Sequence, residues 1–179
     1  MLRTAIFLLM SIPAVAQTTL NGKQLPIPKA SENTLFYLQR SKNTNTVMYE
    51  AKVDQTTGQL VRDLPVNAYW LDYEVGENVK SDLSYFERTA VYGVEAEEAK
   101  DGNGSYIMRL KAFKDRAVTV ARNKLGKYVG LMTINGRKAI LKRIYIEAKE
   151  GMLTPTVVHV DLFGIDPKTG EKVFERIIP

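Results

Sequence analysis

The residues most able to support catalysis are a histidine and an aspartate two positions apart. His159, the single histidine of the chain, and Asp161 lie in the run TVVHVDLFG. Because side chains at i and i+2 of a strand point to the same face, this pair could serve a hydrolase as base and orienting acid. No serine stands in a nucleophile-elbow sequence that would complete the set. The alternative is a lone histidine on the polar face of a half-buried strand, so we assign no catalytic residue.

The composition excludes several other kinds of site. The chain has no cysteine, which excludes thiol catalysis, disulfides and cysteine-based metal sites, and one histidine cannot form a His-rich metal centre. The segment that begins DGNGSY resembles the start of a calcium loop. Its sixth position is Tyr106 instead of glycine, and its twelfth is Ala112 instead of glutamate. We therefore expect no metal site and no cofactor.

Binding surfaces have more support than catalysis. In FYLQRSKNTNTVMYE, residues 36–50, a polar centre separates two apolar runs. Its Asn and Thr side chains could present donors to a glycan or peptide, or could simply bond the backbone of a hairpin turn. Further along, Tyr69 and Trp70 are neighbours in a strand-like run, so one ring should enter the core and the other should face outward. The candidate binding residues are Arg40, Asn43, Asn45, Tyr69, Trp70 and His159.

The first 16 residues have the features of a cleaved signal peptide. Arg3 precedes the apolar stretch TAIFLLMSIPAV, and Ala14-Val15-Ala16 forms a small-x-small cleavage site. The apolar stretch is shorter than the about 20 residues that a spanning helix needs, and no later segment could span a bilayer. We expect an exported protein, periplasmic or secreted, with no transmembrane segment in the mature chain. Export also argues against nucleic acid as a partner.

The formal net charge of +5 is unevenly distributed. The segment from Arg109 to Arg143 carries eleven Lys or Arg and a single acidic residue, Asp115. Such a basic half could meet an anionic partner such as lipid head groups or acidic glycan. Because its basic residues alternate with core-type residues, mutual neutralisation with the acidic remainder is the favoured interpretation.

The residues after the signal predict one β-rich domain. Residues 17–31 are polar with two prolines and indicate an extended lead-in, and residues 32–179 form the domain. Runs rich in Val, Ile, Tyr, Phe and Thr recur, and Asn135-Gly136 is typical of a two-residue hairpin turn. The expected strands are 34–40, 45–53, 59–62, 66–73, 104–113, 117–122, 127–134, 138–148, 155–164 and 171–178.

One segment breaks the strand pattern. SDLSYFERTAVYG has Ser81 as a possible helix N-cap and Gly93 as a stop, with Leu83, Phe86 and Ala90 on one helical face. We expect a helix near 82–91 packed on the sheet. The fold class is therefore mainly β, an antiparallel β-sandwich or barrel with one packed α-helix.

Several motifs resemble one family. The polar stretch has Phe36, Gln39-Arg40, Asn43-Thr44-Asn45-Thr46 and Tyr49 in the places where that family has an aromatic, Gln-Arg, Asn-Thr-Asn-Thr and Tyr. The likeness continues through Pro65-Val66, Tyr69-Trp70, LSYFER and Ala90-Val91-Tyr92-Gly93. On these motifs the chain resembles the exported bacterial proteins grouped as domain of unknown function 4833. The resemblance implies an exported protein of a Bacteroides-like bacterium and carries over no activity and no catalytic residue.

Three functional hypotheses follow. The first is a non-enzymatic binding or cell-envelope interaction module, whose partner would be an envelope glycan, a lipid or another exported protein. The second is a carrier of a small ligand or lipid inside a barrel cavity. The third is a hydrolase that uses His159 and Asp161. The sequence gives an enzyme no positive support and does not determine the oligomeric state.

Overall fold

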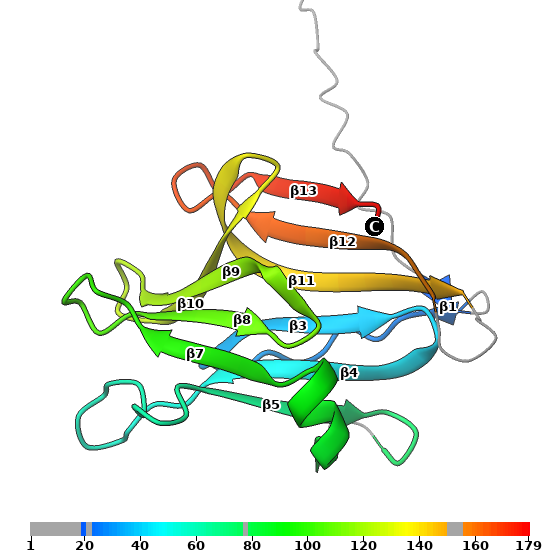
Figure 1. Ribbon diagram of the computed structural model, residues 1–179, viewed down its shortest axis with the longest axis horizontal. Helices are drawn as coiled ribbons and strands as arrows, with labels where there is room; N and C mark the ends of the chain where they lie inside the picture. The colour runs from blue at the N-terminus through cyan, green and yellow to red at the C-terminus, as the bar shows by residue number, and fades with distance from the viewer. Residues whose placement is uncertain (1–18, 21–22, 77–78, 150–155) are drawn as a thin grey trace, which may run out of the picture.

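The computed structural model describes residues 19–20, 23–76, 79–149 and 156–179 (Figure 1). Within these residues, eleven strands form one strongly curled mixed sheet, a half-barrel, and two short strands pair separately. The mainly β prediction is confirmed. The predicted signal peptide, residues 1–16, and part of the predicted lead-in lie outside the described residues.

The strands agree closely with the strand-like runs of the sequence, with four additions at 19–20, 23–24, 79–82 and 94–98. Their bounds are β1 Thr19–Leu20, β2 Lys23–Gln24, β3 Thr34–Arg40, β4 Asn43–Ala51, β5 Val66–Asp72, β6 Val79–Asp82, β7 Val94–Glu98, β8 Tyr106–Leu110, β9 Phe113–Arg122, β10 Tyr128–Ile134, β11 Arg137–Lys149, β12 Thr156–Ile165 and β13 Lys172–Ile177. Residues 59–62, expected as a strand, contribute only an isolated bridge between Val53 and Leu60.

The sheet has two arms joined by the long strand β11. One arm runs β3-β4-β5-β6 and the other runs β10-β9-β8-β7, while β12 and β13 continue from the opposite edge of β11. Every pair in this sheet is antiparallel except β3–β11, which is parallel with Tyr37 opposite Arg143. The two arms curl towards each other, and β5 contacts β7 (Figure 1).

The tight turns follow local backbone preferences. Asn135 and Gly136, the two residues between β10 and β11, have φ of 49° and 73°. Positive φ at both central positions gives the twist that a two-residue hairpin needs, and Asn and Gly tolerate it best. The predicted hairpin at Asn135-Gly136 is therefore confirmed.

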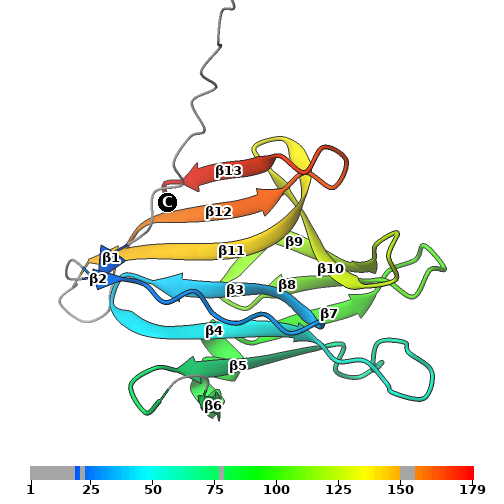
Figure 2. The ribbon, with the colours of Figure 1, turned by 180° about the vertical axis from the view of Figure 1, so that it is seen from behind.

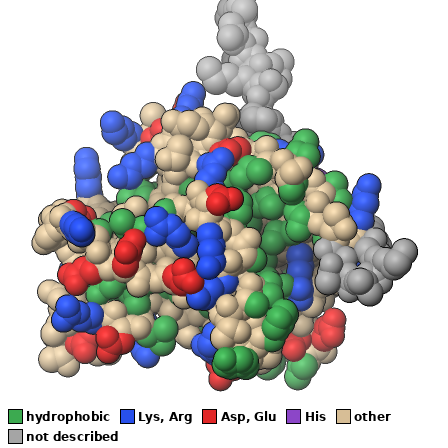
Figure 3. All heavy atoms as spheres, viewed as in Figure 1, with side chains coloured by type: hydrophobic (Ala, Val, Ile, Leu, Met, Phe, Trp, Pro, Cys, Tyr) green, Lys and Arg blue, Asp and Glu red, His purple; other side chains and the backbone are tan. Residues whose placement is uncertain are grey.

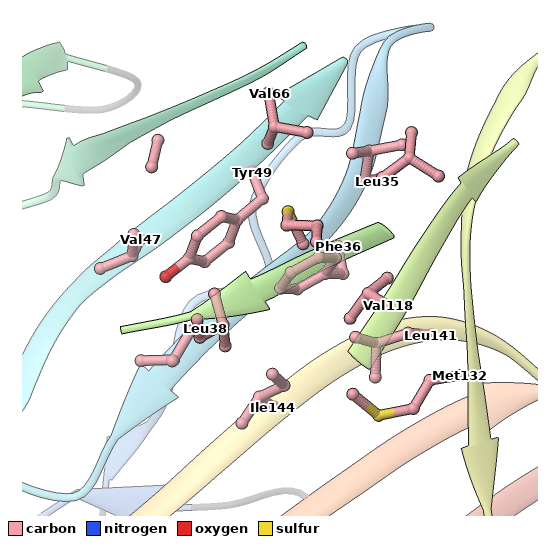
Figure 4. Close-up of a cluster of buried hydrophobic side chains, with 14 of the residues drawn as sticks. Leu35, Phe36, Leu38, Val47, Tyr49, Val66, Val118, Met132, Leu141 and Ile144 are labelled. Carbon is pink, nitrogen blue, oxygen red and sulfur yellow. The ribbon is translucent and has the colours of Figure 1, made fainter. Parts of the chain in front are cut away.

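The inside of the curl is filled by side chains from both arms. Phe36 and Tyr49 stack with ring centroids 4.5 Å apart, close to Val118 and Ile144 (Figure 4). A Cβ on Gly130 would lie 3.0 Å from a methyl of Val118 in the same arm and 3.5 Å from Phe36 Cδ1 in the other, so glycine leaves room for the Phe36 ring between the arms. This apolar interior is the main source of stability, because apolar burial contributes about 25 cal/mol per Å².

The outer face of β3, β4 and β5 carries a second, smaller buried cluster. It contains Met48, Tyr69 and Leu71. The segment between β2 and β3 crosses this side of the sheet (Figure 2), and Leu25 in it is buried. The Gln39 amide donates to the Pro26 carbonyl at 2.7 Å and so ties this segment to β3.

The helical segment is shorter and less buried than the sequence predicts. Ser81 and Asp82 pair with β5 as part of β6, so the expected N-cap is a strand residue. Helical structure begins at residue 85 and is a π-helix over Glu87–Val91, in which no residue is buried. Phe86 was expected to pack on the sheet and is 69% exposed instead. Sheet pairing satisfies the backbone of 81–82, and the helix starts at the next available cap, Ser84.

Candidate functional site

The most organised group of functional side chains surrounds Arg40 at the end of β3. Its guanidinium carbon lies 5.0 Å from the Trp70 ring centroid and 5.3 Å from that of Tyr92. The two rings meet edge to face at 5.1 Å, and Arg40 Nη1 donates to the Tyr92 hydroxyl. Arg40 Nε is buried without an acceptor among the described residues. We call Arg40, Trp70, Glu87 and Tyr92 the Arg40 cluster.

The Arg40 cluster joins strands to the helical segment. The Tyr49 hydroxyl donates to the Tyr92 carbonyl at 2.9 Å, and burial, followed by the nearby Tyr92, raises the pKa of Tyr49. Burial also raises the pKa of Tyr92, against the opposing effect of the Arg40 charge. Burial alone would raise the pKa of Glu87, but hydrogen bonds from Ser84 and Trp70 and the Arg40 charge hold it below its usual value. The cluster therefore places a cation and a carboxylate of lowered pKa beside two aromatic rings.

The helical segment begins with a capping box. The Ser84 N–H and hydroxyl donate to Glu87 Oε2, both at 2.9 Å, and the Glu87 N–H donates back to Ser84 Oγ at 3.3 Å. Such reciprocal bonds satisfy the free donors of a helix start. A π-helical turn is rare and is often found at functional sites. Here it directly follows two large rings that lie in solvent, Tyr85 at 83% and Phe86 at 69% exposure.

Tyr69 lies on the opposite face of β5 from Trp70, as strand alternation predicts. Trp70 enters the main core, whereas Tyr69 belongs to the outer cluster and is also buried. The Lys80 ammonium lies 4.4 Å from the Tyr69 ring centroid and 3.7 Å from Glu50. A depression of about 230 Å³ opens here, lined by Asn67, Tyr69, Lys80, Ser81 and Asp82.

The side chains of Asn43 and Asn45 both accept hydrogen bonds from backbone N–H groups. The Asn45 N–H donates to Asn43 Oδ1 at 2.7 Å, and Asn45 Oδ1 accepts the Tyr73 N–H at 2.9 Å. The turn itself is Ser41-Lys42, and Asn43 opposite Arg40 is already in β4. The polar centre of this stretch therefore fixes a tight hairpin and connects it to the end of β5. Among the six candidate residues, Arg40 and Trp70 are a pair that the fold brings together from distant parts of the chain.

His159 and Asp161 share one face of β12, as the alternation predicts, but Asp161 already has a stronger partner. Arg176 donates to both Asp161 oxygens, at 2.7 and 2.8 Å, whereas His159 Nε2 is 3.6 Å from Asp161 Oδ2. The His159 ring lies 6.4 Å from that of Tyr145 on β11. A bidentate arginine satisfies a carboxylate well. The geometry is that of a partly buried charge pair beside a histidine.

Five of the eleven basic residues between Arg109 and Arg143 form ion pairs with acidic residues from outside that segment. The pairs are Arg109–Glu97 at 3.3 Å, Lys111–Glu95 at 2.5 Å, Lys114–Glu95 at 3.4 Å, Arg137–Glu171 at 3.9 Å and Arg116–Glu175. The acids come from β7 and from the C-terminal hairpin, which flank the basic strands. This arrangement supports mutual neutralisation rather than an open anion-binding face.

The Glu175→Gln variant should lose stability in a pH-dependent way. Burial alone would raise the pKa of Glu175, but the Asn135 N–H and the Arg116 guanidinium outweigh it and lower the pKa. A lowered folded pKa stabilises the protein above the unfolded pKa of about 4.3, and this contribution disappears as the pH falls through the folded value. In urea unfolding at pH 7, 5, 4 and 3, the free energy of unfolding should be higher for wild type than for the variant at pH 7. The two values should converge below about pH 4.

Glu171→Gln is the matched control, because that side chain is 67% exposed and its partner Arg137 is 3.9 Å away. Its unfolding free energy should follow wild type at every pH. A gap between wild type and Glu175→Gln that widens as the pH falls would contradict the assignment.

Sequence reasoning missed Glu87 and Tyr92 as members of a site. Arg40 lies 52 positions from its partner Tyr92, so no local spacing predicts the contact. One signal was present: LSYFER carries a Ser-x-x-Glu capping box at Ser84 and Glu87, which marks a helix N-cap three residues after the expected one, Ser81. A helix capped by Ser84 excludes Leu83, so Phe86 is then not predicted to share a helical face with Leu83.

The described residues contain no group of three or more His, Cys, Asp or Glu that could hold a metal ion. Nor do they contain a helix with the length and hydropathy required to cross a membrane.

The comparisons with known proteins give one match. No curated protein and no solved structure matches the chain. A family model described as a domain of unknown function, DUF4833, matches residues 36–176. The matched range contains the Arg40 cluster, the helical segment and every strand from β4 to β12, and it confirms the resemblance carried by the Gln39-Arg40, Asn-Thr-Asn-Thr and Tyr69-Trp70 motifs. The chain therefore belongs to the DUF4833 family.

Proposed function

We propose that this protein is an exported, non-enzymatic binding module of the cell envelope that captures another exported protein. The binding surface is centred on Tyr85 and Phe86, the exposed rings of the helical segment. The signal-like residues 1–16 support export. The observation that carries the binding proposal is the exposure of these two adjacent rings, 83% and 69%.

Rings this exposed are costly to maintain and useful to a partner. Burying a phenylalanine side chain is worth about 1.5–3 kcal/mol, so leaving two rings in water forgoes a large contribution. Aromatic residues are also enriched among the residues that dominate interface energies. Figure 3 shows hydrophobic side chains gathered on the surface at the helical segment. A binding role accounts for both rings.

The fold holds these rings in place. Glu87, next to Phe86, is tied to Ser84 and to the Arg40 cluster, and the Tyr92 carbonyl accepts the Tyr49 hydroxyl from β4. The Thr89 hydroxyl donates to the Tyr85 carbonyl at 2.8 Å. A pre-organised surface loses less conformational entropy on binding and so binds more tightly.

The surroundings of the rings favour a protein partner. Arg88, two residues after Phe86, and Asp82, 3.9 Å from Arg88, place charges of both signs beside the aromatic pair. An apolar centre with a polar, charged rim is the usual composition of a protein–protein interface. A glycan would need an array of hydrogen-bonding groups beside the rings, and a lipid surface would favour a rim of positive charge.

The two other hypotheses gain less from the structure. The interior of the half-barrel is packed with large side chains such as Phe36, Tyr49 and Met108, each at most 1% exposed, which does not favour a carrier. Both oxygens of Asp161 accept from Arg176, which does not favour a hydrolase that needs this carboxylate for His159.

The Tyr85→Ser/Phe86→Ser double variant tests the binding surface. The chain from Gln17 to Pro179 would be immobilised and exposed to an envelope extract of the source organism, and the captured proteins quantified by mass spectrometry. We expect wild type to enrich a specific protein and the double variant to retain about a tenth or less, because two interface rings are removed.

Phe174→Ser is the matched control, since Phe174 is also a large exposed ring, at 46%, but lies on β13. It should capture as much as wild type, and all three proteins should melt within about two degrees of each other. Equal capture by wild type and the double variant, or no specific capture at all, would overturn the proposal.

A further inference from the structure

We propose that the partner contributes an extended peptide strand, which pairs with the free edge of β6 beside Tyr85 and Phe86. This inference rests on the proposed binding function and specifies how the partner is recognised. It would place the partner's chain as one more strand of the sheet, after β5 and β6.

The backbone of β6 is the first observation. On one side, Val79–Asp82 pairs with β5 in antiparallel register, with Asp82 opposite Tyr69 and Val79 opposite Asp72. On the other side, no strand pairs with β6 among the described residues, and all four of its residues are exposed. Alternate residues of an edge strand direct their N–H and C=O groups outward. The complement of that row of groups is another extended backbone.

The position of β6 relative to the helical segment is the second observation. Both lie at the same end of the sheet, with the helical segment in front in Figure 1 and behind β6 in Figure 2. The Arg88 guanidinium and the Asp82 carboxylate, 3.9 Å apart, connect the segment to the edge strand. A strand added to β6 would therefore lie next to the exposed rings.

The third observation is the depression beside Tyr69 and Lys80. It lies on the face of the sheet edge opposite to the one next to Tyr85 and Phe86. Asn67 and Tyr69 from β5 line it together with Lys80 and Asp82 from β6, so it is on the outer face of the sheet. Trp70, which the Arg40 cluster links to the helical segment, points to the inner face. The edge thus offers a polar depression on one face and two rings on the other.

These two faces define the chemistry of the peptide. Successive side chains of an added strand alternate between the faces. Those on the outer face would meet the ammonium, amide, hydroxyl and carboxylate groups of the depression, which suit a polar side chain. Those on the inner face would meet Tyr85 and Phe86, which suit an apolar one. The expected ligand is an extended peptide of alternating polar and apolar residues.

The test uses a displayed library of random ten-residue peptides, selected against the chain from Gln17 to Pro179. We expect the enriched peptides to alternate polar and apolar residues. Methylating the backbone nitrogens of a selected peptide one at a time should weaken binding about tenfold at every second position only, because alternate N–H groups face β6. Bound peptide should also slow hydrogen exchange of β6 amides.

Proline variants of the edge provide the protein-side test. Lys80→Pro and Ser81→Pro each remove one N–H; one of these two faces β5 and the other faces the free edge. The variant that keeps the wild-type melting temperature is the edge-facing one, and it should lose peptide binding. If both variants unfold, the methylation series and the hydrogen exchange still show whether the peptide pairs with β6 as a strand.

Failure of this inference and failure of the proposed function give different results. Peptide binding that ignores N-methylation and the folded proline variant, or a selection that enriches no peptide, overturns strand addition. The proposed function still stands in that case if Tyr85→Ser/Phe86→Ser loses the envelope partner. Conversely, strand-like peptide binding with unchanged capture by the double variant supports the β6 edge and overturns the role of the rings.

Discussion

Replacement of Phe36 by alanine should lower the free energy of unfolding by about 4 kcal/mol, the largest stability effect we expect from one side chain. The ring is 1% exposed and stacks on Tyr49, and it lies between the arms of the half-barrel (Figure 4). A Cβ on Gly130 of β10 would lie 3.5 Å from its Cδ1 atom, so the ring touches the opposite arm. Its removal would leave a cavity at the contact that holds the two arms together.

Urea unfolding at pH 7 measures this effect, and the melting temperature should fall by roughly 8–16 °C for a domain of this size. Phe174→Ala is the control, because the same group is removed from a side chain that is 46% exposed. It should cost less than about 1 kcal/mol. Similar losses for both variants would show that the Phe36 site collapses without a cavity, or that the arms are held elsewhere.

Replacement of Gly93 by alanine should displace the helical segment and abolish partner capture. An added Cβ would lie 1.7 Å from the Arg88 carbonyl oxygen and 2.7 Å from its carbon, which are backbone atoms that cannot rotate away. The Gly93 N–H donates to the Glu87 carbonyl at 3.2 Å, and the Gly93 carbonyl accepts the Lys111 N–H at 2.9 Å. Because Gly93 is held on both sides, the π-helical turn must open. We expect a cost of about 3 kcal/mol.

Trp70 reports this displacement directly. It is the single tryptophan of the chain, and it contacts Tyr92, the neighbour of Gly93. The emission maximum of the folded variant should shift to longer wavelength as the ring loses this neighbour. Gly102→Ala is the control, since a Cβ there meets nothing within 4 Å and costs only the about 1–2 kcal/mol of a positive φ. Unchanged emission and capture in Gly93→Ala would contradict the role of the helical turn.

The helical segment shows where local reasoning failed. Ser81 and Asp82 are good helix-start residues, and Leu83, Phe86 and Ala90 fall on one face. In the folded chain β5 offers a free edge to residues 79–82, and sheet pairing takes those residues. Ser84 then caps the helix, so Leu83 lies before it and no longer shares a helical face with Phe86, which is 69% exposed. Tertiary pairing overrode the local preference, and this produced the exposed aromatic surface.

The polar stretch shows the opposite case. The Asn43 side chain accepts the nearby Asn45 N–H, as short polar side chains do in turns, whereas that of Asn45 accepts the Tyr73 N–H after β5. Arg40, in the same polar stretch, instead contacts Trp70 and Tyr92. The residue types in this stretch were enough to predict a turn, but they could not identify the residue that leaves it for a distant partner.

What the sequence by itself determined is local. Alternation of residue types located most strands and put Trp70 and Tyr69 on opposite faces of β5, and steric tolerance of positive φ located the Asn135-Gly136 turn. Only the tertiary structure decided that β3 pairs in parallel with β11, that Arg40 meets Tyr92, and that the β6 edge and two aromatic rings stay exposed. The reason is physical. Strand pattern and turn geometry depend on a few neighbouring residues, whereas the choice of strand partners depends on burying the apolar faces of the whole chain together.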